Sequence, residues 1–181
     1  MAIGNNSSNL LKSFSYVAKT DATLLILGSM PGKVSLTQNE YYAHPRNAFW
    51  SIMSHLLGFP LALAYPLRLQ KLLDNQVALW DVMKHCERDS SLDADILESS
   101  IVANDFSAFL NKHTDIKVIA LNGKKAEQSF HRHVWKDLSA EFPSVRPIGL
   151  PSTSPANARI SLEQKREVWI NHLNKSPIAR G

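Results

Sequence analysis

The sequence predicts an α/β fold in which a central four-stranded parallel sheet lies between helices, a three-layer α/β/α sandwich. Two observations support this prediction. Short, continuous apolar runs, which are typical of strands buried on both faces, alternate along the chain with segments of helical periodicity. Strands that alternate with helices form a parallel sheet, because each helix carries the chain back across one face of the sheet.

The first half of the chain contains one expected strand and a long loop. We expect residues 10–18 to form a short helix that covers one edge, and residues 23–28 to form a buried strand. Residues 29–44 are expected to form a loop, and loops of more than about 12 residues are often functional. Pro45 suits the first turn of a helix, which the spacing of apolar residues continues to Gly58.

The second half supplies three further strands. Pro147 interrupts the last of them, which favours an edge position because proline cannot donate to the hydrogen-bond ladder. Residues 81–97 are polar and predict no clear element. The remaining expected strands are 77–80, 116–121 and 145–150, and the remaining expected helices are 67–73, 124–135 and 161–173.

Two helix starts carry capping residues. Asn104 or Asp105 can cap a helix that runs through Asn111, because both side chains accept from exposed backbone N–H groups. Ser161 and Gln164 form the S-x-x-Q pattern of a capping box before the last helix.

The composition is that of an ordinary globular chain. Hydrophobic residues make up 44% and charged residues 20% of the 181 residues, which is enough to bury a sizeable core. We therefore expect residues 1–181 to form a single domain. Residues 1–9 are rich in Asn and Ser and are expected to be a flexible end.

Charge and cysteine content limit the possible partners. The net charge of +4 permits a polyanionic partner without demonstrating one. The single cysteine, Cys86, excludes an internal disulfide and a cysteine-ligated cluster within one chain. No apolar run approaches the roughly 18 residues of a membrane-spanning helix. The N-terminus also lacks a signal-peptide pattern, so we expect a cytoplasmic protein without membrane contacts.

The topology predicts where a ligand binds. In parallel α/β sheets, ligands bind beyond the carboxyl ends of the strands. Three loops follow expected strands and hold unusual polar residues, namely residues 28–47, 122–123 and 150–159. We therefore expect these three loops to form one site.

Each loop has a functional interpretation and a plainer one. Glycines in GSMPG let backbone N–H groups approach a ligand, but a tight turn without chemistry is as well supported. Tyr42 could stack on a flat base, or it could be a half-buried packing residue. Asn47 would lie in the first helical turn, where it could bind water or serve only as a helix-start residue. Ser152 and Ser154 could bind phosphate, although a Ser/Pro loop is common.

Other chemistries have little support in the sequence. His131 and His133 are two residues apart, so on a helix they point in different directions and make a poor metal pair. The chain has no GxSxG motif and no P-loop lysine motif.

Four motifs together resemble the uracil-DNA glycosylase superfamily: GSMPG, YYAHPRNAFW, LNGKKA and LPSTSPAN. Within it, the chain is most similar to the hypoxanthine-DNA (deoxyinosine) glycosylase family. The resemblance runs in the same order along the chain from residue 24 to residue 173. The resemblance implies the same four-stranded sheet between helices. It also implies that a damaged nucleotide leaves the DNA duplex and enters a pocket at the strand ends.

The resemblance implies roles for individual residues. The backbone of Ser29 and Met30 would contact the base edge, and Tyr42 would stack on the base. The full implied substrate-binding set is Gly28, Ser29, Met30, Pro31, Gly32, Tyr42 and His44. The implied DNA-binding set is Ser152, Thr153, Ser154, Asn157 and Arg159, and either Asn157 or Arg159 would fill the gap left by the flipped base.

The chain departs from the superfamily at the residue that positions water. Many members carry Asn, Asp or Glu in the first motif, where this chain has Met30, which cannot activate water. The polar group must come from elsewhere. Asn47 is our first candidate and Asn122 the second, at the end of the third strand, where it could read the base. Asn39 is the third.

The expected reaction is hydrolysis of the N-glycosidic bond of a flipped deoxyinosine in double-stranded DNA, which leaves an abasic site. The recognised motifs place no lysine as a nucleophile, so we expect no strand cleavage. No metal, organic cofactor or obligate protein partner is expected. Two alternatives remain: a uracil-DNA or mismatch-specific uracil-DNA glycosylase, and a non-catalytic binder of damaged DNA or nucleotides. The preference among hypoxanthine, xanthine and uracil stays open.

Overall fold

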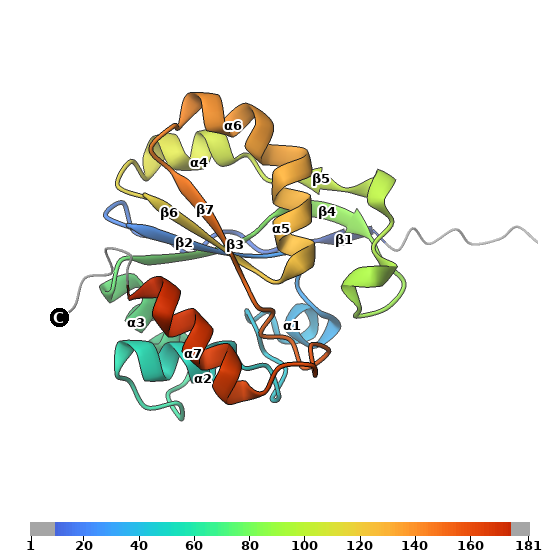
Figure 1. Ribbon diagram of the computed structural model, residues 1–181. Coiled ribbons are helices and arrows are strands. Elements are labelled where there is room, and N and C mark those ends of the chain that lie inside the picture. The colour runs from blue at the N-terminus through green and yellow to red at the C-terminus, as the bar shows by residue number, and fades with distance from the viewer. Residues whose placement is uncertain (1–9, 175–181) are drawn as a thin grey trace, which may run out of the picture.

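A computed structural model describes residues 10–174 of the chain, so the expected flexible end at residues 1–9 lies outside the described residues. The core of the fold is a four-stranded sheet in the order β3-β2-β6-β7, with every neighbouring pair parallel (Figure 1). Its strands are β2 (Leu24–Gly28), β3 (Val77–Asp81), β6 (Val118–Asn122) and β7 (Arg146–Leu150). The predicted four-stranded parallel sheet is confirmed.

Burial explains why these runs are continuously apolar. Every residue of β2, β3 and β6 is buried, because side chains on both faces meet a hydrophobic cluster. Leu25 and Leu27 point into one cluster, and Leu24 and Ile26 point into the other. β7 lies at one edge of the sheet, as Pro147 predicted.

Helices cover both faces and complete the α/β/α sandwich (Figure 1). On one face lie α4 (Phe106–Lys112), α5 (Lys124–Phe130) and α6 (Lys136–Glu141), and on the other lie α2 (Phe49–Leu57), α3 (Tyr65–Asp74) and α7 (Leu162–Leu173). The expected caps are present: the Asp105 side chain accepts from the N–H of Ala108, and Ser161 and Gln164 form a capping box. None of the helices within residues 10–174 has the length and apolar character that a membrane crossing requires.

The helix expected at residues 10–18 is wrong. This segment contains β1 (Leu10–Lys12), which pairs with β4 (Met83–Glu87) in a second, antiparallel sheet with β5 (Val102–Ala103). Farther along, Val17 forms a bridge with Leu79 of β3. Pairing with strands that are distant in sequence has overridden the local helical pattern.

Residues 81–97 also contain more structure than the sequence predicted. They hold β4 and the 3₁₀ turn η1 (Asp93–Asp95), and a second 3₁₀ turn, η2 (Glu98–Ser100), follows. The expected loop at residues 29–44 contains a short helix, α1 (Lys33–Gln38). The expected helix at residues 124–135 is α5 continued by a π-helical stretch, η3 (His131–Trp135), before α6.

Candidate active site

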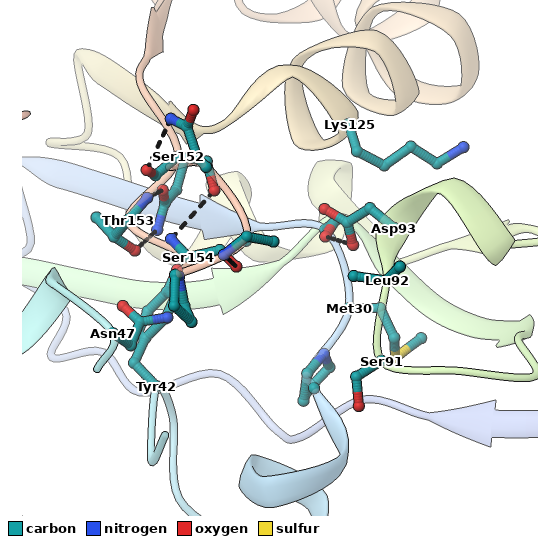
Figure 2. A pocket seen from close by; sticks show the side chains of 18 of the residues that line it. Met30, Tyr42, Asn47, Ser91, Leu92, Asp93, Lys125, Ser152, Thr153 and Ser154 are labelled. Atoms are coloured by element: carbon teal, nitrogen blue, oxygen red, sulfur yellow. Dashed lines mark hydrogen bonds between the residues drawn. The ribbon is translucent and has the colours of Figure 1, made fainter. Parts of the chain in front are cut away.

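A cavity of about 990 Å³ opens at the carboxyl ends of the parallel strands (Figure 2). All three loops that the topology placed together line it, and residues 91–94 form part of the opposite wall. In Figure 2, Tyr42, Asn47 and the 152–154 loop lie on one side, whereas Met30 and residues 91–93 lie on the other. The site is therefore built by segments from across the whole chain.

Thr153 connects the three loops. The Asn122 Oδ1 atom accepts from the N–H of Thr153, and Asn122 Nδ2 donates to Thr153 Oγ1, both over 2.9 Å. The carbonyl oxygen of Thr153 in turn accepts from the N–H of Ala48, also over 2.9 Å. Asn122 and Thr153 are both buried, so Thr153 is an internal support of the loop and its side chain is not at the surface.

Asn47 is held at the wall of the cavity by its own carboxamide. Its Oδ1 atom accepts from the N–H of Phe49 over 3.0 Å, which satisfies an exposed donor at the start of α2. The helix therefore begins at Phe49, and the expectation that Pro45 opens it with Asn47 in the first turn is wrong. The Nδ2 group of Asn47 has no protein partner within residues 10–174, and the side chain is half-buried in the cavity.

Tyr42 offers one ring face to the cavity. Its ring stacks on Phe49 with centroids 4.0 Å apart and an angle of 22° between planes, so one face is covered. The backbone of Tyr42 lies in the left-handed region at φ 55°, which is uncommon for a bulky residue and holds the ring in this position. Burial and the nearby Asp81 carboxyl raise the pKa of Tyr42, so the phenol stays protonated.

Gly28 is needed because two side chains approach its Cα. A Cβ atom at this position would lie 2.6 Å from Asp81 Oδ1 and 3.2 Å from the Tyr42 hydroxyl oxygen. At Gly32, by contrast, a Cβ would meet nothing within 4 Å. Only the first glycine of GSMPG is therefore required by close packing against the site.

The rest of the 28–32 loop is tied to the neighbouring strand. The carbonyl oxygens of Gly28 and Ser29 accept from the N–H groups of Val82 and Met83. The Met30 side chain lines the cavity and packs in a small buried cluster with Met83, Cys86 and Ile96. Met30 therefore serves as an apolar wall, consistent with its inability to activate water.

The 150s loop is organised by its own hydroxyl groups. Ser152 Oγ accepts from the N–H of Ser154, and Ser154 Oγ accepts from the N–H of Ala156. Both hydroxyls act here as acceptors, so each retains an O–H that can donate to a phosphate oxygen. The Asn157 side chain donates to the Ser152 carbonyl and lines the cavity, whereas Arg159 is exposed and lies outside the lining.

The remaining candidates have separate positions. Pro31 and His44 line the cavity, and His44 Nδ1 accepts from the N–H of Arg46. Asn39 ends α1 in the left-handed conformation at φ 54°, is exposed and does not line the cavity. Asparagine is favoured at such helix ends, which explains Asn39 without a catalytic role.

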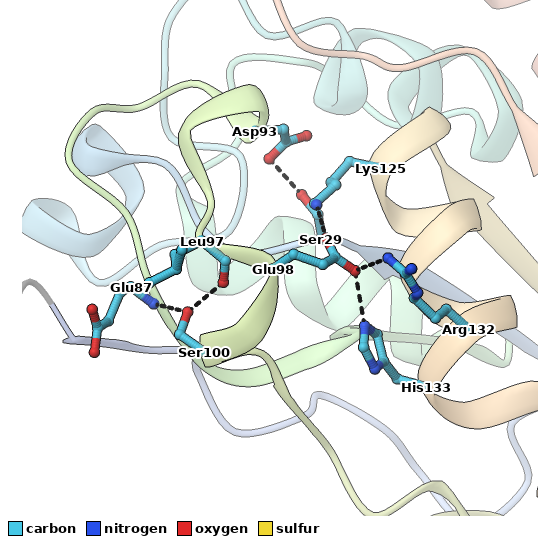
Figure 3. Close-up of polar contacts among 9 residues, drawn as sticks. All are labelled: Ser29, Glu87, Asp93, Leu97, Glu98, Ser100, Lys125, Arg132 and His133. Carbon is cyan, nitrogen blue, oxygen red and sulfur yellow. Dashed lines mark hydrogen bonds and ion pairs between the residues drawn. The ribbon is translucent and has the colours of Figure 1, made fainter.

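Glu98 fastens the segment that carries residues 91–94 (Figure 3). Its carboxylate accepts from Lys125 over 2.7 Å, Arg132 over 3.0 Å and His133 over 3.1 Å. The hydrogen bonds from Lys125 and His133 lower the pKa of Glu98 to about 2. At the other end of the segment, Ser29 Oγ donates to Asp93 Oδ1 over 2.8 Å.

Comparison with known proteins decides the family. The family model described as the uracil DNA glycosylase superfamily matches residues 14–175. The chain belongs to this superfamily. It is therefore a DNA glycosylase, an enzyme that hydrolyses N-glycosyl bonds, and DNA is its substrate.

Two curated relatives and one solved structure are similar to this glycosylase. A hypoxanthine DNA glycosylase from Methanosarcina barkeri is 34% identical over 171 residues, which are 91% of this chain and 98% of the relative. Another from Methanosarcina acetivorans is 34% identical, over 86% of this chain and 94% of the relative. The solution structure of a candidate uracil DNA glycosylase from Methanosarcina acetivorans has a TM-score of 0.72 at 31% identity. The matched region covers 91% of this chain and 99% of the chain in that structure.

Sequence reasoning missed Asp81 and residues 91–94 in the glycosylase site. Asp81 ends β3, lines the cavity and is only 3% exposed. Burial raises its pKa to about 8, with a further rise from the charge of Asp93 and an opposing effect from Arg88. The signal was available: Asp81 directly follows the apolar run 77–80, where the rule on strand ends places ligand-binding side chains.

Proposed function

We propose that this glycosylase removes hypoxanthine from deoxyinosine in double-stranded DNA by a monofunctional reaction that leaves an abasic site. The observation that carries the proposal is the Asn47 carboxamide, whose Oδ1 caps Phe49 while its Nδ2, without a partner among residues 10–174, lies at the cavity wall beside Tyr42. The two curated relatives, each named hypoxanthine DNA glycosylase, support hypoxanthine as the base.

The cavity suits a base that has left the duplex. An enzyme cannot reach C1′ of a stacked nucleotide from the groove, so the nucleotide must flip into a pocket. The free face of Tyr42 would stack on the purine, while Phe49 supports its other face. The O–H groups of Ser152 and Ser154 would bind the phosphates beside the flipped nucleotide, and the positive net charge of the chain favours this approach.

Asn47 would direct the attacking water. The water oxygen bonds to C1′ as the C1′–N9 bond breaks, and the bonding electron pair leaves with the purine. One proton of the water is released, and the purine finally takes up one proton as free hypoxanthine. A carboxamide is too weak a base to deprotonate water, so Asn47 only positions it. Stabilisation of the departing purine then supplies most of the lowering of the activation barrier.

The lysines of the cavity wall are engaged elsewhere, which supports a monofunctional reaction. Lys125 pairs with Glu98 over 2.7 Å, and Lys124 pairs with Glu127 over 3.0 Å. Lys33 Nζ donates to the carbonyl oxygen of Asp89 over 3.2 Å. A charged ammonium has no lone pair for attack on C1′, so none of the three is suited to form a Schiff base.

A duplex oligonucleotide with one deoxyinosine tests this function. We expect sites that break on alkali treatment and remain intact without it, together with release of free hypoxanthine. Parallel duplexes with deoxyuridine and deoxyxanthosine measure the base preference. Release of uracil without release of hypoxanthine would identify a uracil-DNA glycosylase, as the name of the superfamily allows. Tight binding without release of any base would identify a non-catalytic binder.

A further inference from the structure

The inner wall of the cavity contains a buried carboxyl, that of Asp81, next to the buried hydroxyl of Tyr42. Within the described residues, Asp81 Oδ2 is buried and makes no hydrogen bond. The Tyr42 hydroxyl beside it is also buried, and Asn122 interacts with it and opposes the rise in its pKa. Both side chains converge on Gly28, whose missing Cβ leaves the room between them. Because buried polar groups are nearly always hydrogen-bonded, the Asp81 carboxyl indicates a place where a ligand supplies the partner.

The surroundings of Asp81 disfavour a charged carboxylate. Its side chain forms no ion pair within residues 10–174, and Arg88, whose charge opposes the rise in the pKa of Asp81, donates to the carbonyl oxygen of Pro31. Asp93 adds a second negative charge from η1. Tyr41 and Tyr42, which face Asp81 from the 41–47 segment, both have raised pKa values and stay neutral. Burial and the charge of Asp93 outweigh the opposing charge of Arg88 and favour the protonated acid.

The depth of Asp81 determines which edge of the base it meets. The sugar stays in the DNA strand, so it remains near the more exposed Asn47 and Ser152 at the mouth of the cavity. The part of a purine farthest from its sugar is the six-membered ring, which in hypoxanthine carries O6 and N1–H. A neutral carboxylic acid complements this pair of groups, since its O–H donates to O6 and its C=O accepts from N1–H.

We propose that Asp81 binds the flipped base as a neutral carboxylic acid, donating a hydrogen bond to O6 and accepting one from N1–H. This inference rests on the proposed function and names the residue that contacts the base. Negative charge gathers on O6 as the C1′–N9 bond breaks, so a donor already placed there stabilises the departing purine. A carboxylic acid kept neutral by an apolar site can act in this way.

The proposal predicts an alkaline limit on base release. Once Asp81 ionises, it presents only acceptors to O6 and repels the departing anion. Single-turnover release of hypoxanthine by the wild type should therefore fall by about tenfold per pH unit above pH 8. Asp93→Asn removes a neighbouring negative charge, which lowers the pKa of Asp81, so its alkaline fall should begin at a lower pH.

Asp81→Asn is the decisive variant, because a carboxamide keeps one donor and one acceptor in the same shape but cannot ionise. It should retain clearly more activity at pH 7 than Asp81→Ala, which should lose at least about a hundredfold. The alkaline fall should disappear in Asp81→Asn, apart from the part caused by ionisation of the base itself. Identical pH profiles in the wild type and Asp81→Asn, or a fully active Asp81→Ala, would overturn the proposal.

An infrared measurement separates this proposal from the proposed function. The C=O stretch of a protonated carboxylic acid is resolved from that of a carboxylate. The wild-type spectrum at pH 7 should contain a protonated-acid band that Asp81→Asn lacks and that fades as the pH rises above 8. Absence of this band overturns the role of Asp81 whether or not the enzyme is active. An inactive wild type that shows the band contradicts the function proposed for the site and, with it, the role of Asp81 in base release.

Discussion

Asn122 and Thr153 hold each other through two hydrogen bonds of 2.9 Å across 31 residues of sequence. The Asn122 carboxamide thereby accepts from the N–H of Thr153, as a backbone carbonyl would in a strand or helix, and it also donates to the Thr153 hydroxyl. We infer that Asn122 acts as an anchor for the 150s loop, rather than as a catalytic group. The loop it anchors is the one expected to bind DNA phosphates.

Removal of the Asn122 carboxamide should therefore destabilise the fold and loosen the DNA-binding loop. Asn122→Ala leaves the buried N–H of Thr153 without a partner, so we expect a loss of about 1–3 kcal/mol in the free energy of unfolding. Urea denaturation measures this loss, and DNA affinity should weaken with it. Thr153→Val is the matched control, because it removes only the hydroxyl and keeps the bond between its N–H and Asn122. An Asn122→Ala variant of wild-type stability with slow base release would instead favour a catalytic role.

The two glycines that begin and end GSMPG should respond differently to the same added methyl group. In Gly28→Ala the new Cβ lies 2.6 Å from Asp81 Oδ1, so the carboxyl and the Tyr42 ring must move. We expect a cost of about 1–3 kcal/mol in stability and a large loss of base release. Gly32→Ala meets open space and should lose much less activity. Equal losses of base release in both variants, measured by single-turnover assay, would show that the close approach of Asp81 and Tyr42 to Gly28 does not contribute to base release.

Asp81 should make the fold less stable as the pH rises. Its pKa is about 8 in the folded chain against 3.8 for an unperturbed aspartic acid side chain, so between these values the folded state holds a proton that the unfolded state has released. The slope of the free energy of unfolding is then negative, by up to about 1.4 kcal/mol per pH unit. Asp81→Asn should therefore gain stability over the wild type at pH 7 and gain little near pH 4. Urea midpoints at several pH values measure the difference, and a gain that does not change with pH would contradict a neutral Asp81.

The sheet could be predicted because burial on both faces forces strands such as Leu24–Gly28 to be continuously apolar. The rule on strand ends then placed Asn122 and the 150s loop near Asn47. The strand at Leu10–Lys12 could not be found in this way, because its pairing with β4 depends on residues more than 70 positions away.

The site was less predictable where function depends on a side chain's surroundings. Asn39 and Asn47 follow the same strand, and only the fold shows that one ends a helix in solvent while the other lies in the cavity. Asp81 was passed over because the polar segment after it showed no periodicity. Its importance comes from burial beside Gly28 and Tyr42, which no local pattern reveals.

The central claim is that Asn47 directs the water that attacks C1′, and three variants separate this role from its cap on α2. Asn47→Ala removes both roles, and loss of the cap should cost about 1 kcal/mol in stability. Asn47→Asp keeps an acceptor for the N–H of Phe49 and can still bind water, so it should retain more activity. Asn39→Gly, which suits the left-handed backbone at that position, is the control outside the cavity.

The most direct measurement is single-turnover release of hypoxanthine from a deoxyinosine duplex, with enzyme in excess and DNA affinity measured in parallel. We predict that Asn47→Ala slows release by about a hundredfold or more while DNA affinity changes little. Asn39→Gly should release the base at the wild-type rate. Release by Asn47→Ala at the wild-type rate would contradict the account and would assign the water to another group.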